Sequence, residues 1–217
     1  MFFETGVYFV TDPRMCAGNG LGLIETVLAA YRGGIRFIQL RDKHASSRDF
    51  FEITLALAQA LPNDAHLIIN DRDDVFLAAQ HSGANVAGVH IGQDDLPPEV
   101  VRSLIGPDAI LGLSVGNEAE VHAANALGGV LNYIGCGVLR QTATKTDAPP
   151  ALGLSGLSAL NDLSFHPVVA IGGIKTSDIT SLKALGIAGA AIVSEICLAT
   201  DVSAKAKELT GLWVDRS

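Results

Sequence analysis

Alternating polar residues in the segment QLRDK place two cations and an amide on one side of an extended chain. Gln39, Arg41 and Lys43 are two residues apart, so their side chains point the same way in a strand, and Asp42 points the other way. Two cations aimed in one direction suit a multiply charged anion, because the arginine fork can hold phosphate oxygens with two hydrogen bonds. The alternative is a strand end at which Arg41 or Lys43 forms a salt bridge with a neighbouring carboxylate.

Acidic residues follow the next two apolar runs. In IINDRDD, Asn70 and Asp71 come directly after three apolar residues. The segment HIGQDDLPP carries two adjacent aspartates, Asp94 and Asp95. Carboxylates on neighbouring strands repel each other unless a cation lies between them, and one or two carboxylates plus substrate phosphates form the usual Mg²⁺ site. We therefore predict Asp71 and Asp95 as magnesium ligands. For the other aspartates of these segments we expect helix capping or solvent exposure.

A long hydroxyl-rich loop follows a later apolar run. The segment GVLRQTATKTDAPPALGL, residues 137–154, has no helical or strand pattern in its middle. Loops longer than about 12–15 residues are uncommon in compact domains and are often functional. Thr142 and Thr144 are two residues apart and Lys145 follows, so two hydroxyls and an ammonium could close over an anion.

Three further strand ends add weaker signals. Ser114 ends the run LGLSV and can donate a hydrogen bond, and in AIGGI the pair Gly172 and Gly173 lets the backbone approach a ligand closely. Ser194, in AIVSE, precedes a helix. Many α/β barrels bind a phosphate at these last two positions through free backbone N–H groups. Taken alone, the glycines serve tight turns equally well.

The elements that position these residues read as alternating strands and helices. Helical segments such as 47–61 and 176–186 have apolar residues recurring at three and four, and the strands are apolar on both faces, which implies a parallel sheet covered by helices. With no linker along the chain, we predict one domain over residues 1–217, a TIM barrel of the closed (β/α)8 type with parallel strands. An open doubly wound sheet is the alternative. The eight strand candidates are 7–12, 36–43, 66–71, 88–92, 109–115, 130–137, 167–173 and 189–195.

This architecture predicts where the polar residues should lie. Chemistry in such barrels lies at the C-terminal ends of the strands, and the residues named above end or follow the runs from the second to the eighth. We therefore expect one mouth with two phosphate-handling regions. One, at strands two to four, includes a metal, and the other, at strands six to eight, does not.

Composition limits the partners and the location. The net charge of −8 at pH 7 argues against a nucleic-acid partner held by a broad basic surface, although a local cluster of cations can still bind an anion. Three cysteines without metal-binding spacing, no signal-peptide pattern and no long apolar run predict a cytoplasmic protein with reduced thiols and no membrane partner. A homo-oligomer stays open.

The segments QLRDK, IND, GVHIGQDDLP, GLSV, TATKTD, AIGGI and IVSE, in this order, resemble the thiamine phosphate synthase family over nearly the whole chain. The resemblance implies a transferase that joins 4-amino-2-methyl-5-hydroxymethylpyrimidine diphosphate to a thiazole phosphate. The products are thiamine phosphate and pyrophosphate, and the cofactor is Mg²⁺.

The resemblance also assigns residues. Asp71 and Asp95 would hold Mg²⁺, and Arg41, Lys43, Ser114 and Lys145 would be catalytic. The pyrimidine diphosphate would be bound by Gln39, Leu40, Arg41, Asp42, Lys43, Asn70, Ser114 and Lys145. The thiazole phosphate would be bound by Thr142, Ala143, Thr144, Gly173, Val193 and Ser194.

One departure and three alternatives accompany this resemblance. The family commonly has an aromatic residue and a proline before the paired threonines, whereas this chain has Val138-Leu139-Arg140-Gln141, which makes Arg140 a candidate phosphate contact. A related barrel family isomerises the thiazole phosphate, with His90 or His122 as candidate proton carriers here. That family typically lacks the full diphosphate set present in this chain. A non-catalytic sensor would not need the metal residues, and a Schiff-base aldolase would need a lysine within a strand.

Overall fold

Eight short strands pair edge to edge until the last meets the first, in a computed structural model that describes residues 4–141 and 151–214. Every neighbouring pair is parallel, and β8 closes the barrel by pairing Gly6 of β1 with Gly189. The closed barrel is therefore confirmed over the open sheet. The strands are β1 (Gly6–Val10), β2 (Phe37–Leu40), β3 (His66–Asn70), β4 (Gly88–Ile91), β5 (Ile110–Val115), β6 (Tyr133–Gly137), β7 (Val168–Ile171) and β8 (Gly189–Ile192).

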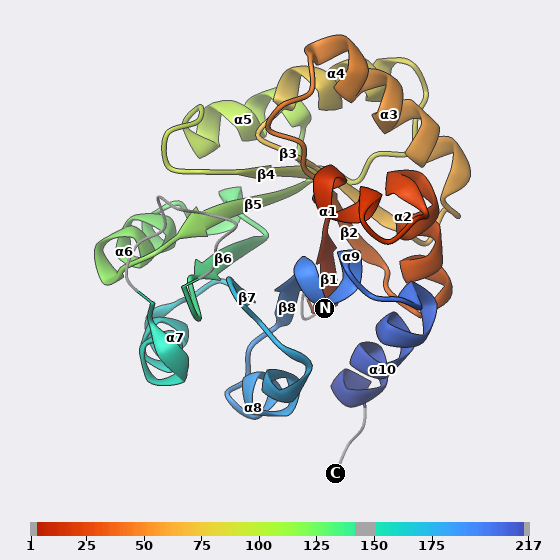
Figure 1. Cartoon of the computed structure of the whole chain (residues 1–217). Helices are drawn as coiled ribbons and strands as arrows, with labels where there is room; N and C mark the ends of the chain where they lie inside the picture. Colours follow the sequence, from red (N-terminus) through yellow and green to blue (C-terminus); the bar gives the residue numbers. More distant parts are fainter. Residues whose placement is uncertain (1–3, 142–150, 215–217) are drawn as a thin grey trace.

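Helices form an outer ring around these strands (Figure 1). Helix α3 shows why they form: the Ser46 side chain accepts the Asp49 N–H at the first turn, and the apolar side chains of Phe50 and Leu57 face the barrel and are buried. The helices are α1 (Pro13–Ala17), α2 (Gly22–Arg32), α3 (Ser47–Ala60), α4 (Asp73–His81), α5 (Pro98–Ile105), α6 (Glu118–Ala126), α7 (Gly153–Leu163), α8 (Ile179–Ala184), α9 (Ser194–Cys197) and α10 (Val202–Val214), with 3₁₀ turns η1 (Gly128–Val130) and η2 (Thr176–Asp178).

Alternation along the strands divides the core into two layers. Outward-facing residues such as Ile38 and Leu40 pack against the helices in a large shell. Inward-facing residues form a smaller cluster inside the barrel, made of Tyr8, Val10, Phe37, Ile68, Tyr133, Val169 and Ala191. Because the period of a strand is two, a residue that continues an inward series at the end of a strand points into the mouth of the barrel.

Most strands are shorter than the sequence patterns indicated, mainly at their C-terminal ends, whereas β6 ends where predicted and begins three residues later, at Tyr133. The predicted runs 36–43 and 167–173 leave the hydrogen-bonded ladder after Leu40 and Ile171. Asp71 leaves β3 with a φ of 60°, and Gly172 and Gly173 have φ values of 93° and 68°. A ladder cannot continue through this left-handed backbone, so the chain turns into the rim loops at these residues.

The three cysteines are free thiols and are buried, as expected. Two of them, 181 residues apart, meet where α1 packs on α9: the Cys16 thiol donates to the Cys197 sulfur at 3.3 Å. Among the helices that the described residues form, none combines the length and apolar character that a membrane span requires.

Gly112 gives a test of the barrel interior. A Cβ atom at this position would lie 2.2 Å from Cζ of the buried Tyr133 ring, whereas a Cβ at Gly129 would meet nothing within 4 Å. We expect Gly112→Ala to lower the free energy of unfolding by about 1–3 kcal/mol, because an overpacked core must shift side chains or backbone. Urea unfolding of this variant and of the Gly129→Ala control measures the difference, and equal midpoints would contradict the packing described.

Candidate active site

A cavity of about 930 Å³ opens at the C-terminal ends of the strands. It brings together residues that are up to 184 positions apart in the sequence, from Val10 to Ser194. The predicted residues that line it are Gln39, Arg41, Lys43, Asn70, Asp71, Asp95, Ser114, Gly173, Val193 and Ser194. The predicted residues Thr142, Ala143, Thr144 and Lys145 lie outside the described residues.

Two other predicted residues have side chains that do not line this cavity. Leu40 is fully buried in the shell between strands and helices. The Asp42 carboxylate accepts the N–H groups of His44 at 2.8 Å and Ala45 at 3.2 Å, so it stabilises the turn after β2. Both follow from the alternation of the QLRDK segment, in which these two residues point away from the mouth.

The cations of QLRDK are available for a ligand. The backbone of Arg41 is fixed, because its N–H donates to the buried Thr11 hydroxyl at 2.9 Å and its carbonyl accepts from that hydroxyl at 3.2 Å. Its guanidinium and the Lys43 ammonium form no salt bridge with any carboxylate of residues 4–141 and 151–214. The salt-bridged strand end considered from the sequence is therefore not found in this part of the chain.

Asp71 and Asp95 face each other across the ends of β3 and β4. Burial raises the pKa of Asp71, and the neighbouring Asp95 raises it further through its charge and a side-chain hydrogen bond, while Asn70 and Lys43 act in the opposite direction. The Asp95 carboxylate accepts a hydrogen bond from the Gly92 N–H at 2.7 Å. The Asp71 N–H donates to the His90 carbonyl at 2.9 Å, which fixes its unusual backbone. Two carboxyl groups are thus held together in spite of their repulsion.

This pair fits a divalent cation. A bound cation would remove the repulsion that raises the pKa of Asp71. No group of three or more metal-ligating side chains occurs in the described part of the chain, so the protein would supply two carboxylates here. Mg²⁺ is commonly bound by one or two carboxylates, and substrate phosphates and water complete its coordination.

A buried chain of hydrogen bonds crosses the barrel beneath the cavity. The Gln39 amide donates to the Tyr8 hydroxyl at 3.1 Å, which lies 3.0 Å from the Tyr133 hydroxyl. His90 Nδ1 lies 2.9 Å from the Tyr133 hydroxyl, and His90 Nε2 lies 2.9 Å from the Ser114 hydroxyl. The chain therefore links the floor of the barrel to two residues of the cavity, Gln39 and Ser114.

One direction of this chain pairs the hydrogens of both tyrosine hydroxyls. Because the Gln39 amide nitrogen can only donate, the Tyr8 hydroxyl donates to Tyr133, which then donates to Nδ1 of His90. A neutral imidazole donates from its other nitrogen, so Nε2 donates to Ser114 and the serine hydrogen is left for the cavity. Burial lowers the pKa of His90 to about 4, which keeps the ring neutral near pH 7.

The loops after β7 and β8 line another part of the cavity. Gly172 and Gly173 follow β7, and Val193 and Ser194 connect β8 to α9. The Arg140 guanidinium, a candidate phosphate contact from the sequence, donates to the Asp178 carboxylate instead. No other ion pair within the described residues involves Arg140.

Sequence reasoning missed three contributors to this site. In the sequence, Tyr8 and Tyr133 look like ordinary strand residues, and Asp178 looks like part of a helix. Their hydrogen-bond partners are 31 or more positions away, so no local pattern reveals them. His90, a candidate proton carrier for an isomerase, instead has both ring nitrogens in hydrogen bonds of the buried chain, which is a structural role. The one available signal was the occurrence of polar tyrosines in otherwise apolar strands, which usually marks a hydrogen-bond partner inside the core.

Comparison with protein families gives one match over most of the chain. The family model described as thiamine monophosphate synthase matches residues 7–196. A thiamine-phosphate synthase of Azorhizobium caulinodans is 44% identical over 208 residues, which cover 95% of this chain and 94% of the relative. A thiamine-phosphate synthase of Xanthobacter autotrophicus is 45% identical with the same coverage.

A solved structure agrees in fold and sequence. The thiamine phosphate pyrophosphorylase from Pyrococcus furiosus superimposes with a TM-score of 0.82 at 33% sequence identity. The match covers 97% of this chain and 96% of that protein.

The buried imidazole gives a prediction of pH dependence. Unfolded His90 takes up a proton near its ordinary pKa of 6.5, whereas the folded protein does so only near 4, so the unfolded state binds more protons in between. Stability should therefore fall as the pH falls from 6.5 to 4, by about 3 kcal/mol in total from this group. Urea unfolding across this range should show a smaller loss for His90→Asn, and an equal loss would show that other groups carry it.

Proposed function

The chain belongs to the thiamine monophosphate synthase family, and we propose that its rim cavity joins a hydroxymethylpyrimidine diphosphate to a thiazole phosphate. Membership of this family makes the chain a transferase of thiamine biosynthesis whose product is thiamine phosphate. The residues that bind the two substrates, the magnesium ion, a homo-oligomer and a cytoplasmic location stay predictions.

The observation that carries the proposal is the pairing of two anion-binding regions in one cavity. On one side, Arg41 and Lys43 have no salt-bridge partner among the described residues and lie in the same cavity as the Asp71–Asp95 pair. On the other side, the backbone at Gly173 and Ser194 lines the cavity without a carboxylate pair. A coupling reaction between a diphosphate and a monophosphate needs two such regions within reach of each other.

The first region suits departure of pyrophosphate. The leaving group develops negative charge as its bond to the pyrimidine methylene breaks, and Arg41 and Lys43 are placed to neutralise it. The Ser114 hydroxyl has a hydrogen left to donate, because its oxygen accepts from His90. Mg²⁺ held by Asp71 and Asp95 would supply further charge neutralisation. From the family resemblance, Lys145 would add a third cation to this region.

The second region suits the thiazole phosphate. A monophosphate can be held by backbone N–H groups at Gly173 and at the Val193-Ser194 dipeptide, without a metal. From the resemblance, Thr142 and Thr144 would contribute hydroxyls and Ala143 backbone contacts. Held this way, the thiazole nitrogen attacks the pyrimidine methylene carbon, and the protein contributes position and charge rather than a nucleophile.

The same geometry argues against an isomerase that uses His90. Proton transfer to and from carbon needs a group that changes its protonation near neutral pH. Both ring nitrogens of His90 are engaged with Tyr133 and Ser114, and burial holds its pKa near 4. His122 lies on the exposed side of α6.

The coupling assay tests the proposed function. Purified protein, Mg²⁺ and both substrates should yield thiamine phosphate and pyrophosphate in equal amounts, each detected by chromatography. Omission of either substrate is the control. Conversion of one thiazole phosphate isomer to another without coupling would favour the isomerase.

Removal of one carboxylate tests the metal assignment. We expect Asp95→Asn to abolish the Mg²⁺-dependent rise in melting temperature and to lower turnover by about 100-fold or more, because charge stabilisation of the leaving group is lost. Without metal, the same variant should be more stable than the wild type, because Asp71 no longer faces a like charge. Activity with Mg²⁺ and with EDTA, and melting temperature with and without Mg²⁺, measure both effects.

Asp108→Asn is the matched control, because Asp108 is exposed and makes the same change of charge before β5, outside the residues that line the cavity. It should keep both the activity and the metal response. Full activity of Asp95→Asn in EDTA would contradict the assignment of this pair.

A further inference from the structure

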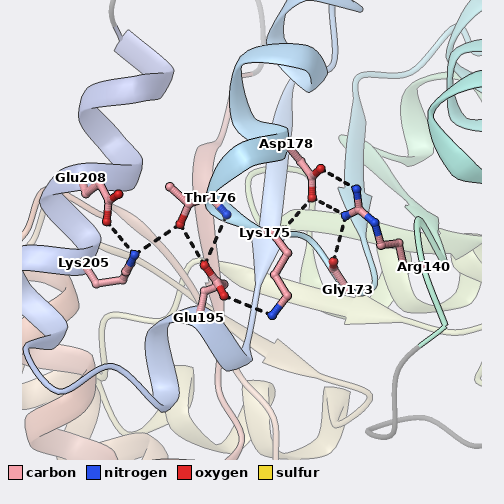
Figure 2. A network of polar contacts seen from close by, with 8 residues as sticks. All are labelled: Arg140, Gly173, Lys175, Thr176, Asp178, Glu195, Lys205 and Glu208. Carbon is pink, nitrogen blue, oxygen red and sulfur yellow. Dashed lines mark hydrogen bonds and ion pairs between the residues drawn. The ribbon is translucent and has the colours of Figure 1, made fainter.

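A network of polar contacts ties the loops after β6, β7 and β8 together (Figure 2). Its members, which we call the rim network, are Arg140, Gly173, Lys175, Thr176, Asp178, Glu195, Lys205 and Glu208. The three loops it connects carry the segments proposed to hold the thiazole phosphate. Its contacts therefore bear on how that site is shaped.

The strongest link is the pair formed by Arg140 and Asp178. Two guanidinium nitrogens bind the two carboxylate oxygens, with Nη2 donating to Oδ1 at 2.7 Å. Asp178 is only 5% exposed, and its Oδ2 also accepts the Lys175 N–H at 2.8 Å. The hydrogen bonds from Arg140 lower the pKa of Asp178, so the carboxylate stays charged. Bidentate geometry fixes the plane of the guanidinium as well as its position.

Arg140 also holds two successive carbonyl groups of the glycine turn. Its backbone N–H donates to the Gly172 carbonyl at 3.0 Å, and Nη1 donates to the Gly173 carbonyl at 3.3 Å. In a trans peptide the C=O and the following N–H point in opposite directions. The N–H groups of Gly173 and Ile174 are therefore directed away from Arg140.

These two N–H groups have no hydrogen-bond acceptor among residues 4–141 and 151–214. Gly173 and Ile174 both line the cavity, and the Ile174 side chain is buried. A buried backbone N–H without a partner is costly unless a ligand or water accepts from it. Two adjacent donors of this kind suit the oxygens of a phosphate.

The remaining contacts join this turn to α9. The Glu195 carboxylate accepts from the Thr176 hydroxyl at 2.8 Å and from Lys175 Nζ at 3.1 Å, and Glu195 directly follows Ser194. Lys205 of α10 donates to the Thr176 hydroxyl at 3.3 Å. The backbone around Gly173 and the backbone around Ser194 are thus fixed relative to each other.

We propose that Arg140 and Asp178 form a positioning pair, which aims the N–H groups of Gly173 and Ile174 at the thiazole phosphate. This inference rests on the proposed function. Arg140 acts here through the backbone of the glycine turn and does not itself contact the phosphate. The charge of Arg140 is neutralised by Asp178. The Arg140 side chain is 48% exposed and lines the cavity.

Steady-state kinetics with each substrate varied in turn tests the proposal. We expect Arg140→Gln to raise KM for the thiazole phosphate about ten- to hundredfold, the range for a lost charge-assisted hydrogen bond. The KM for the pyrimidine diphosphate and kcat should stay within about twofold, because the other side of the cavity is unchanged. Arg140→Lys should resemble Arg140→Gln, since an ammonium keeps the charge but cannot reproduce the fork.

Asp178→Asn separates positioning from direct contact. If Arg140 only positions the turn, Asp178→Asn should also raise KM for the thiazole phosphate, and the double variant with Arg140→Gln should be no worse than either single variant. If Arg140 contacts the phosphate directly, Asp178→Asn would free its charge and leave that KM equal or lower, which would overturn the proposal. An equal rise in KM for both substrates would also overturn it, as a general loss of structure.

Arg36→Gln is the matched control. Arg36 pairs with Asp64 at 2.8 Å at the opposite end of the barrel, next to the start of β2, so both KM values should remain as in the wild type. The wild-type assay separates the two proposals. If the wild type forms no thiamine phosphate, the proposed function fails. If it does form thiamine phosphate and Arg140→Gln leaves KM for the thiazole phosphate unchanged, only the positioning role fails.

Discussion

Closure of a parallel sheet is the constraint on which the rest of this structure depends. Because β8 pairs with β1 in the same direction as every other neighbour, all eight strands end at one rim. Alternation then sorts each strand into outward residues that pack under helices and inward residues that reach the mouth. Leu40 and Gln39 are adjacent in sequence, yet one lies in the shell and the other joins the buried chain beneath the cavity. A slip of one residue in β2 would exchange their positions.

A protein with a net charge of −8 would bind two anions in this cavity only through the local arrangement of its donors and cations. The cations of QLRDK are kept free of carboxylates of the described chain, while Arg140, another cation of the same cavity, is neutralised by Asp178. In the proposed arrangement, one side of the cavity offers side-chain cations beside a carboxylate pair, and the other offers backbone N–H groups. That difference would direct a diphosphate and a monophosphate to separate places.

Much of this site could be predicted from the sequence, because a polar residue at the end of an apolar run signals the rim of a parallel barrel. Asp71, Asp95 and Ser114 were placed at this rim in this way, and all three line the cavity. Most strands were predicted to end later in the sequence than they do. The apolar run before Asp71, for example, does not reveal that this residue adopts a left-handed backbone. Contacts between distant segments were not predictable: Arg140 and Asp178 are 38 residues apart, and no local pattern links them.

In the proposed complex, the two phosphate groups occupy different sides of one cavity, and only one of them is accompanied by a metal. Anomalous diffraction from a crystal that contains Mn²⁺, a non-hydrolysable pyrimidine diphosphonate and the thiazole phosphate tests it directly. We predict a manganese peak between Asp71 and Asp95 that contacts the diphosphonate. The thiazole phosphate should lie at Gly173 and Ser194 with no metal. Manganese at the thiazole phosphate, or both ligands bound on the same side, would contradict the account.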